Sequence, residues 1–234
     1  FRKAAVLGAG VMGAQIAAHL ANAGLQVELL DLPGEGNKNA IVEGAFLQAQ
    51  KVKPNPFFSE KVTRRIQLGN FDDHLERIAE VDWVIEAVVE DPTIKQELMA
   101  RIEAVVKDGT IVSTNTSGIP IQLITEGRST AFKQRFLGTH FFNPPRYLKL
   151  LEVIPGIETD PEVVSRITRF GRERLGKGVV ITKDTPGFIG NRIGVYEVMH
   201  SIHTLIDGTY TIEEIDALTF STTKKFQGMS GHRK

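Results

Sequence analysis

Apolar residues follow two spacings along the chain, and their alternation predicts the class of fold. Short continuous apolar runs, as at 4–7, are typical of buried strands. Between such runs, segments such as 93–106 carry apolar residues three and four positions apart, a spacing that predicts helices. Strands that alternate with helices favour a parallel sheet with helices on both faces. We therefore expect an α/β fold built on a doubly wound, mostly parallel sheet.

The same patterns give the expected elements in chain order. The expected strands are 4–7, 25–31, 65–69, 81–89, 110–113, 135–142, 147–154 and 179–182. The expected helices are 14–24, 39–51, 59–66, 93–106, 161–175 and 187–207. Thr93 is the expected N-cap of the fourth helix, and Thr211 of a further short helix over 211–219. Residues 220–234 lack apolar periodicity, so we expect them to be disordered.

A glycine-rich turn joins the first expected strand to the first expected helix. Gly8 allows a sharp turn, Gly10 leaves room for a pyrophosphate beside the backbone amides, and Gly13 lets the helix lie close to the sheet. The helix then presents unpaired N–H groups and a positive dipole end to phosphates. This context predicts a Rossmann-type dinucleotide site, although the same turn also suits a βαβ unit that binds no nucleotide. The expected coenzyme contacts here are Gly8, Gly10, Val11, Met12 and Gly13.

An acid ends the second expected strand, as the dinucleotide fingerprint requires. Asp31 follows Gly13 by 18 residues and is placed to accept hydrogen bonds from the adenosine ribose hydroxyls. Its charge would repel a 2′-phosphate, so the expected coenzyme is NAD and not NADP. The alternative for Asp31 is an acid at a strand end that is simply solvated.

Polar residues follow two later strands, where a parallel sheet places its ligands. Glu90 comes after the strand at 81–89, and Asn115, Thr116 and Ser117 come after the strand at 110–113. Because ligands lie beyond the carboxyl ends of such strands, these side chains are candidates for the nicotinamide side of the site.

A histidine and a glutamate lie in two strands that flank a Pro-Pro loop. Twelve residues separate His140 from Glu152, so they cannot share a helical face, but neighbouring strands would bring them together. A carboxylate inside a strand needs a partner, and an imidazole is the simplest one. The residues alone leave two possibilities open, a structural histidine and a general base.

Composition and charge exclude several classes of protein. The chain has 28 basic and 28 acidic residues, which argues against a nucleic-acid partner. It has no cysteine, so a disulfide or a thiolate metal site is impossible, and we expect no metal. No apolar run approaches the ~20 residues that span a bilayer, and a strand begins too early for a signal peptide. We therefore expect no membrane association and a cytoplasmic location.

The segment at about 34–64 is a longer excursion than a Rossmann core needs. It carries several basic residues, which would attract a phosphorylated substrate tail such as that of coenzyme A. A helical hairpin with ordinary solvated charges explains them equally well. These residues are Lys51, Lys53, Lys61, Arg64 and Arg65.

Five sequence words, taken together, resemble one enzyme family. GAGVMG, EAVVE, NTSG, GTHFFNPPRYLKLLEV and KDTPGFIGNR are similar in order and spacing to the L-3-hydroxyacyl-CoA dehydrogenases of the bacterial fatty-acid oxidation type. The similarity runs from residue 3 to about 218. It implies NAD-dependent oxidation of L-3-hydroxyacyl-CoA to 3-oxoacyl-CoA in fatty-acid β-oxidation.

The resemblance also implies roles for single residues. His140 matches the general base and Glu152 the carboxylate that orients it and stabilises its cation. Ser117 and Asn191 match the residues that hydrogen-bond the oxygen of the substrate. A further set is implied at the nicotinamide end of the coenzyme. That set is Glu90 and Lys95 beside the ribose, and Asn143 in the histidine loop.

Family members continue with a helical second domain that builds a homodimer and closes the substrate cleft. Here little follows the expected helix at 187–207, so we expect a C-terminally truncated chain. The expected domains are 1–183, the NAD-binding Rossmann domain, and 184–234, the start of an all-α domain. Dimerisation and full activity are then in question. The alternatives are a dehydrogenase of a free hydroxy or sugar acid, and a non-catalytic, crystallin-like NAD-binding protein.

Overall fold

The computed structural model describes residues 1–218, which fall into two compact units. The first unit is Phe1–Phe188, and the second begins at Ile189. The expected domain boundary between residues 183 and 184 remains a prediction.

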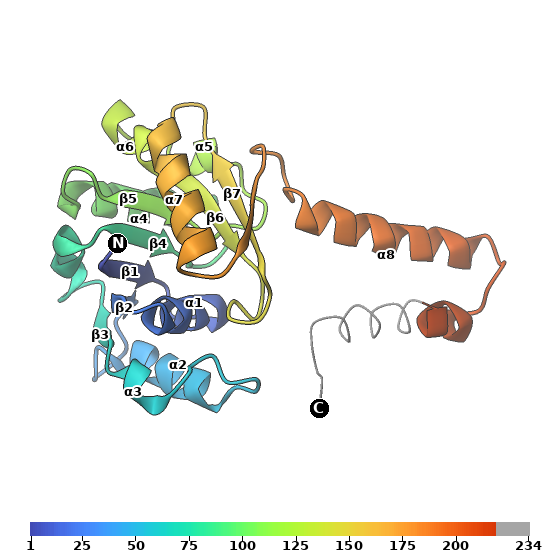
Figure 1. The fold of residues 1–234 in the computed structure, drawn as a ribbon, viewed down its shortest axis with the longest axis horizontal. Helices are drawn as coiled ribbons and strands as arrows, with labels where there is room; N and C mark the ends of the chain where they lie inside the picture. The colour runs from blue at the N-terminus through green and yellow to red at the C-terminus, as the bar shows by residue number, and fades with distance from the viewer. Residues whose placement is uncertain (219–234) are drawn as a thin grey trace. The chain divides into compact units, whose positions relative to one another are not determined.

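The first unit is built on one eight-stranded sheet with the spatial order β3-β2-β1-β4-β5-β6-β7-β8 (Figure 1). The strands are β1 (Lys3–Leu7), β2 (Gln26–Asp31), β3 (Ile66–Asn70), β4 (Trp83–Glu86), β5 (Ile111–Thr114), β6 (Phe136–Phe141), β7 (Leu150–Pro155) and β8 (Gly178–Ile181). The first six run parallel, β7 is antiparallel to β6, and β8 is parallel to β7. The expected α/β fold with a mostly parallel sheet is confirmed.

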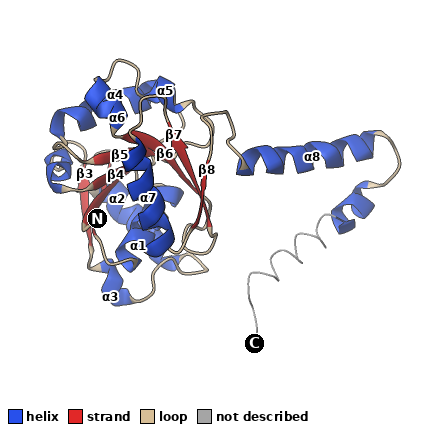
Figure 2. Ribbon diagram, turned by 45° about the horizontal axis from the view of Figure 1, so that its top comes forward, coloured by secondary structure: helices blue, strands red, loops and turns tan. Residues whose placement is uncertain are grey.

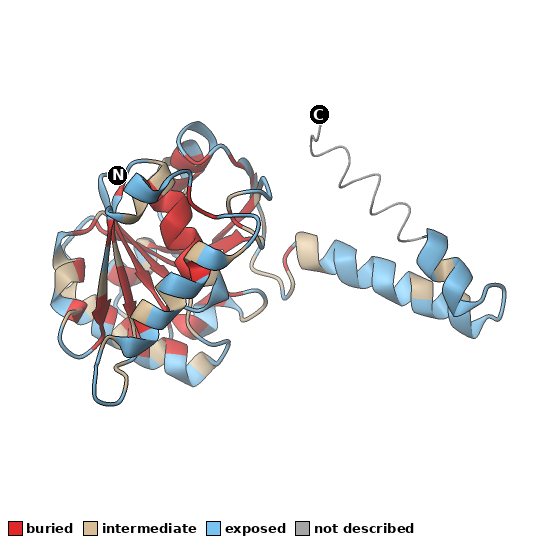
Figure 3. Cartoon of the chain, turned by 90° about the horizontal axis from the view of Figure 1, so that it is seen from below, coloured by how far each residue is buried: buried red, intermediate tan, exposed pale blue. Residues whose placement is uncertain are grey.

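Helices cover both faces of this sheet (Figure 2). They are α1 (Val11–Asn22), α2 (Ala40–Lys51), α3 (Glu60–Thr63), the 3-10 helix η1 (Leu75–Glu80), α4 (Pro92–Val105), α5 (Ile121–Ile124), α6 (Thr130–Gln134) and α7 (Pro161–Glu173). One apolar cluster joins α1, α2 and α7 to one face, and another joins η1, α4, α5 and α6 to the opposite face. Both clusters are buried, as Figure 3 shows for the interior of this unit, so the strands read as continuous apolar runs.

The N-cap of α4 differs from the expected one. Asp91, and not Thr93, caps the helix, because its carboxylate accepts the N–H of Ile94 at 3.0 Å. Pro92 occupies the first helical position, where its missing N–H costs nothing. Ile94 also remains 45% exposed, so the buried face of α4 consists of other residues. Those residues are Lys95, Leu98, Met99 and Ile102.

Several expected elements are shorter than predicted; the strand expected over 81–89, for example, is only β4 (Trp83–Glu86). The helix expected over 59–66 is the single turn α3, because Ile66 already pairs with Val27 in the sheet. The strand expected over 147–154 begins only at Leu150. The N–H groups of Tyr147 and Leu148 both bond to the carbonyl of Pro144, which holds this stretch in a turn.

The second unit contains α8 (Gly190–Ile206) and a short helix over 212–218. None of the residues of α8 is buried (Figure 3). The prediction for Thr211 is confirmed: its hydroxyl accepts the N–H of Glu214, and the Glu214 carboxylate accepts the N–H of Thr211. The expected disorder of 220–234 concerns residues outside the described part.

In residues 1–218, no helix combines the length and apolar character needed to cross a bilayer.

Candidate active site

The glycine-rich turn has the geometry that the sequence predicts. Gly8 has a φ of 98°, a conformation that favours glycine. A Cβ atom at Gly13 would lie 1.8 Å from the carbonyl oxygen of Gly8, so α1 packs on the turn at backbone distance. A Cβ atom at Gly10 would meet no atom within 4 Å, so this side of the turn is open. That opening is where a pyrophosphate can approach the backbone.

The amino end of α1 faces this opening with its dipole uncompensated. The first helical hydrogen bond runs from Ala14 N–H to the Gly10 carbonyl, so the amides of Val11, Met12 and Gly13 precede it. The first turn carries no acidic residue that would neutralise the positive end of the dipole. These groups fit the phosphates of a dinucleotide.

Asp31 and an apolar pocket lie beside the turn. The Asp31 carboxylate accepts the N–H of Ala9 at 2.6 Å and that of Leu32 at 2.7 Å, which fixes both oxygens at the carboxyl end of β2. A pocket of about 310 Å³ opens next to it, and its lining is mostly apolar. Its lining includes Leu32, Phe71, Val88, Ile94, Leu98 and Arg101, together with Gly8, Gly10 and Asp31. The apolar lining suits the flat adenine ring of NAD, and Asp31 beside it suits the adenosine ribose. The residues present therefore fit NAD.

His140 and Glu152 form a direct pair in the hairpin of β6 and β7. They are opposite each other in the register, and His140 Nδ1 lies 2.7 Å from Glu152 Oε2. The Glu152 side chain is fully buried and that of His140 is 6% exposed. The predicted proximity is confirmed. Because Nδ1 faces the carboxylate, Nε2 is the nitrogen that remains for a proton from another molecule.

Two aromatic rings lie close to the imidazole. The ring of Phe142 lies 4.5 Å away and that of Phe188 5.7 Å away, between centroids. Asn115, at the end of β5, accepts the N–H of Phe141 at 2.9 Å and so ties the two strand ends together. Asn143 accepts a hydrogen bond from Gln15 of α1 at 3.3 Å. The structure therefore brings Asn115 and Asn143 to the same end of the sheet as His140.

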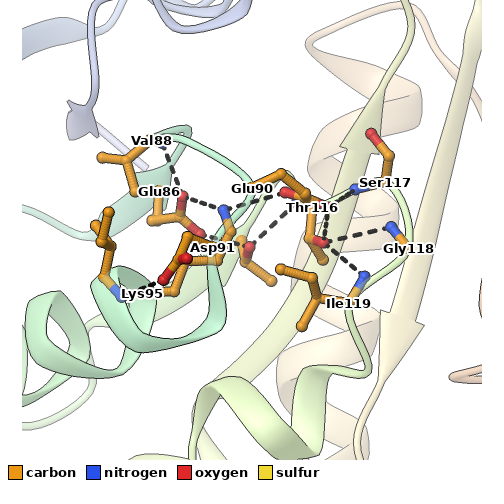
Figure 4. A network of polar contacts seen from close by, with 11 residues as sticks. Glu86, Val88, Glu90, Asp91, Lys95, Thr116, Ser117, Gly118 and Ile119 are labelled. Atoms are coloured by element: carbon orange, nitrogen blue, oxygen red, sulfur yellow. Dashed lines mark hydrogen bonds and ion pairs between the residues drawn. The ribbon is translucent and has the colours of Figure 1, made fainter.

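A buried ion pair lies beneath the loops that follow β4 and β5 (Figure 4). Lys95 of α4 is 1% exposed and pairs at 2.6 Å with Glu86, which is fully buried at the end of β4. Thr114 and the N–H of Val88 complete the hydrogen bonds to Glu86, at 2.6 and 2.8 Å. All of these donors satisfy a carboxylate that would otherwise be costly to bury.

The same lysine reaches the candidate residue Glu90 at 3.4 Å. Glu90 also accepts hydrogen bonds from the Thr116 hydroxyl and the Ser117 N–H. Partial burial raises the pKa of Glu90, but these hydrogen bonds and Lys95 outweigh it and hold the pKa below its ordinary value. In Figure 4 the Ser117 side chain points away from this carboxylate. Lys95 therefore supports Glu90 from the interior, while Glu90 orders the loop that carries Ser117.

One residue of this network, Glu86, was not predicted, and one predicted residue lies in the second unit. Glu86 interrupts the apolar run of β4, and this charge inside a strand was the available signal. Thr116 was among the candidates for the nicotinamide side, and its hydroxyl donates to Glu90. Asn191 lies in α8, which belongs to the second unit, so its predicted place in the site remains a prediction.

Comparisons with known proteins agree with this geometry. A family model described as "3-hydroxyacyl-CoA dehydrogenase, NAD binding domain" matches residues 3–185. The chain is 49% identical over 220 residues to a probable 3-hydroxyacyl-CoA dehydrogenase of Deinococcus radiodurans, covering 93% of this chain and 64% of that protein. The chain thus spans less than two thirds of the length of this relative.

Two solved structures are similar in fold and sequence. The (S)-3-hydroxybutyryl-CoA dehydrogenase of Ralstonia eutropha has a TM-score of 0.75 and 28% identity, over 91% of this chain and 74% of that one. An NAD-dependent dehydrogenase of a formyl-hydroxy-methylpyridine carboxylic acid has a TM-score of 0.75 and 30% identity, over 96% and 72%.

Proposed function

Because the chain belongs to the 3-hydroxyacyl-CoA dehydrogenase family, we propose that it oxidises L-3-hydroxyacyl-CoA to 3-oxoacyl-CoA with His140 as general base. The observation that carries this proposal is the 2.7 Å contact between His140 Nδ1 and Glu152 Oε2. The contact lies at the same end of the sheet as the glycine-rich turn and Asp31, the residues that fit NAD. Fatty-acid β-oxidation is the pathway that such a reaction serves.

The chemistry divides between coenzyme and protein. Bound NAD supplies the hydride acceptor, so the protein has to handle the proton of the alcohol. His140 Nε2 takes this proton, since Nδ1 is already engaged with Glu152. The carboxylate keeps the ring in one orientation and stabilises the imidazolium that forms. A fully buried carboxylate does this well, because water does not compete for it.

The substrate oxygen needs hydrogen-bond donors that hold it in line with the imidazole. Ser117 fits this role because its loop is ordered by Glu90 through the backbone N–H, and its side chain points away from that carboxylate. Asn191 is the second donor in our proposal, on the grounds of the family words alone. Glu90, Asn115 and Asn143 would hold the nicotinamide end of the coenzyme.

Coenzyme A is the proposed carrier of the substrate. The excursion that contains α2 and α3 bears the basic residues named above and lies on β2 and β3, beside the coenzyme half of the unit. Arg146, in the loop after β6, donates hydrogen bonds to the carbonyls of Asn55 and Phe57 in this excursion. The basic segment is therefore tied directly to the histidine loop.

A free acid is the second candidate substrate, and one comparison favours it. The similar structure that acts on a pyridine carboxylic acid has the same fold at 30% identity. In that case a single carboxylate would replace the thioester and the long coenzyme A tail, and the basic excursion would have no part in recognition.

Turnover assays with paired substrates test the proposal. The loss of NADH absorbance is measured with acetoacetyl-CoA and, separately, with free acetoacetate. Turnover with the thioester supports the proposed function, whereas turnover with only the free acid supports the second candidate. No turnover with either substrate, together with NADH binding, would indicate a non-catalytic NAD-binding protein and contradict the proposal.

Substitution of the base tests the mechanism. His140→Gln should lower kcat by at least about a hundredfold, the usual contribution of a positioned base. NADH affinity should stay within about threefold, because the coenzyme is held mainly by groups elsewhere. His203→Gln, the same change at an exposed histidine of α8, is the matched control. Retained turnover in His140→Gln would refute the assignment of the base.

A further inference from the structure

A buried lysine lies behind the loop that joins β6 to β7, and none of the roles assigned above uses it. Lys177 directly precedes β8 and is 5% exposed. Burying an ammonium group is costly unless it is paired and hydrogen-bonded. Within residues 1–218 no carboxylate lies within ion-pairing distance of it. Burial lowers its pKa to about 8, which reflects this cost.

The lysine instead donates to the main chain of the loop. Its Nζ hydrogen-bonds the carbonyl of Pro145 and, at 2.7 Å, the carbonyl of Leu148. It also lies 5.8 Å from the centre of the Phe141 ring. All three contacts are with the segment that leads from His140 to the start of β7. Within the described residues, the ammonium is therefore compensated by two carbonyl groups and an aromatic ring of this segment, and not by a carboxylate.

The lysine is itself rigidly placed. Its N–H bonds the carbonyl of Gly171 in α7, and the next residue, Gly178, pairs with β7. Along β6, side chains alternate between the faces of the sheet, so Phe141 and His140 point to opposite faces. Lys177 contacts the Phe141 side, and it therefore braces the strand end from the face opposite the imidazole.

We propose that Lys177 is a positioning residue of the active site, which fixes the loop between β6 and β7 and thereby His140 and Asn143. The loop is also held by Gln15, which donates to Asn143, and by Arg146. Lys177 contacts the chain on both sides of this loop, since Phe141 ends β6 and Leu148 lies shortly before β7. The proposal rests on the proposed role of His140.

Amide exchange and histidine NMR of the whole chain test it. In Lys177→Met the amides of Tyr147 and Leu148 should exchange roughly tenfold faster, because a charged donor to two carbonyls is lost. The ring resonances of His140 should shift in the same variant. Lys177→Arg, which retains charge and donors, should restore most of both properties. Lys107→Met is the matched control, since Lys107 is exposed and also donates to a carbonyl, that of Glu80.

Unchanged loop exchange in Lys177→Met would overturn the proposal, and so would faster exchange with an unchanged His140 spectrum. If Lys177→Met does not fold, a pH titration of the His140 resonances in the wild-type chain replaces it as the test. His19 faces Lys177, and its pKa is lowered by burial and by Lys177. Burial lowers the pKa of Lys177 itself to about 8. The His140 resonances should then move with that midpoint, and a flat response would overturn the proposal. These readouts do not need turnover, so they stay separate from a failure of the proposed function.

Discussion

A buried histidine next to this lysine makes the protein sensitive to acid. His19 lies on the buried face of α1 and is 7% exposed. Burial, and to a smaller extent Lys177, lowers its pKa from 6.5 to about 4, while the carbonyl of Leu175 opposes the shift. The folded protein therefore keeps His19 neutral at a pH where the unfolded chain already protonates it.

The size and sign of the effect follow from this shift. Because the folded-state pKa is the lower one, stability is complete above pH 6.5 and is lost as the pH falls toward 4. At about 1.4 kcal/mol per pKa unit, the whole loss is about 3 kcal/mol, of which about 2 kcal/mol is reached by pH 5. Leucine has a similar volume and cannot be protonated. His19→Leu should therefore remove this loss.

Urea unfolding at pH 7 and pH 5 measures it. Relative to the wild type, the free energy of unfolding of His19→Leu should rise by about 2 kcal/mol between pH 7 and pH 5. Taking the difference cancels the titration of all other groups. The exposed-site variant His203→Gln should keep the acid dependence of the wild type. If His19→Leu and the wild type lose the same free energy of unfolding between pH 7 and pH 5, the pKa of His19 is not lowered in the folded protein, and the prediction is wrong.

Three further variants test the coenzyme half of the site. Gly13→Ala should destabilise the fold by about 3 kcal/mol or more in urea unfolding, because the Cβ would lie 1.8 Å from a backbone oxygen. Lys95→Met should cost about 3–5 kcal/mol in the same assay, since it leaves Glu86 buried without its cation. Adding Glu86→Leu should recover part of that loss, and no recovery would speak against the pair. Asp31→Ser should weaken NADH binding roughly tenfold and narrow the preference over NADPH, measured by coenzyme fluorescence. An unchanged coenzyme preference would contradict the role of Asp31.

The sequence predicted those parts of the molecule whose causes are local. The glycine turn, the order of strands and helices, and the pairing of His140 with Glu152 all depend on short words and their spacing. The pair was predictable because a Pro-Pro loop between two apolar strands leaves few ways to connect them. The N-cap of α4 was missed for a local reason as well. Asp91 and Thr93 both suit a cap, and Pro92 at the first helical position decides between them.

The remaining features depend on contacts between distant residues. Lys177 and Pro145 are 32 positions apart, and Lys177 is placed against the loop by the neighbouring pairing of β8 with β7. His19 occupies an ordinary helical position, and its low pKa arises from what packs over it. Neither residue belongs to a motif, and neither has a local partner that periodicity can reveal. Such residues can be found only when the packing is known.

The antiparallel hairpin brings the carboxylate that we propose to orient the base to the level of His140. In a parallel sheet, side chains beyond the carboxyl ends of strands lie in loops, where water competes for them. Because β7 runs back against β6, Glu152 returns inside a strand to the level of His140, near the end of β6. The carboxylate is therefore oriented by the sheet ladder and shielded by it, while the imidazole stays near the open edge. A residue inserted between Asn143 and Leu150 would leave this ladder intact, whereas one inserted within β7 would turn Glu152 to the opposite face.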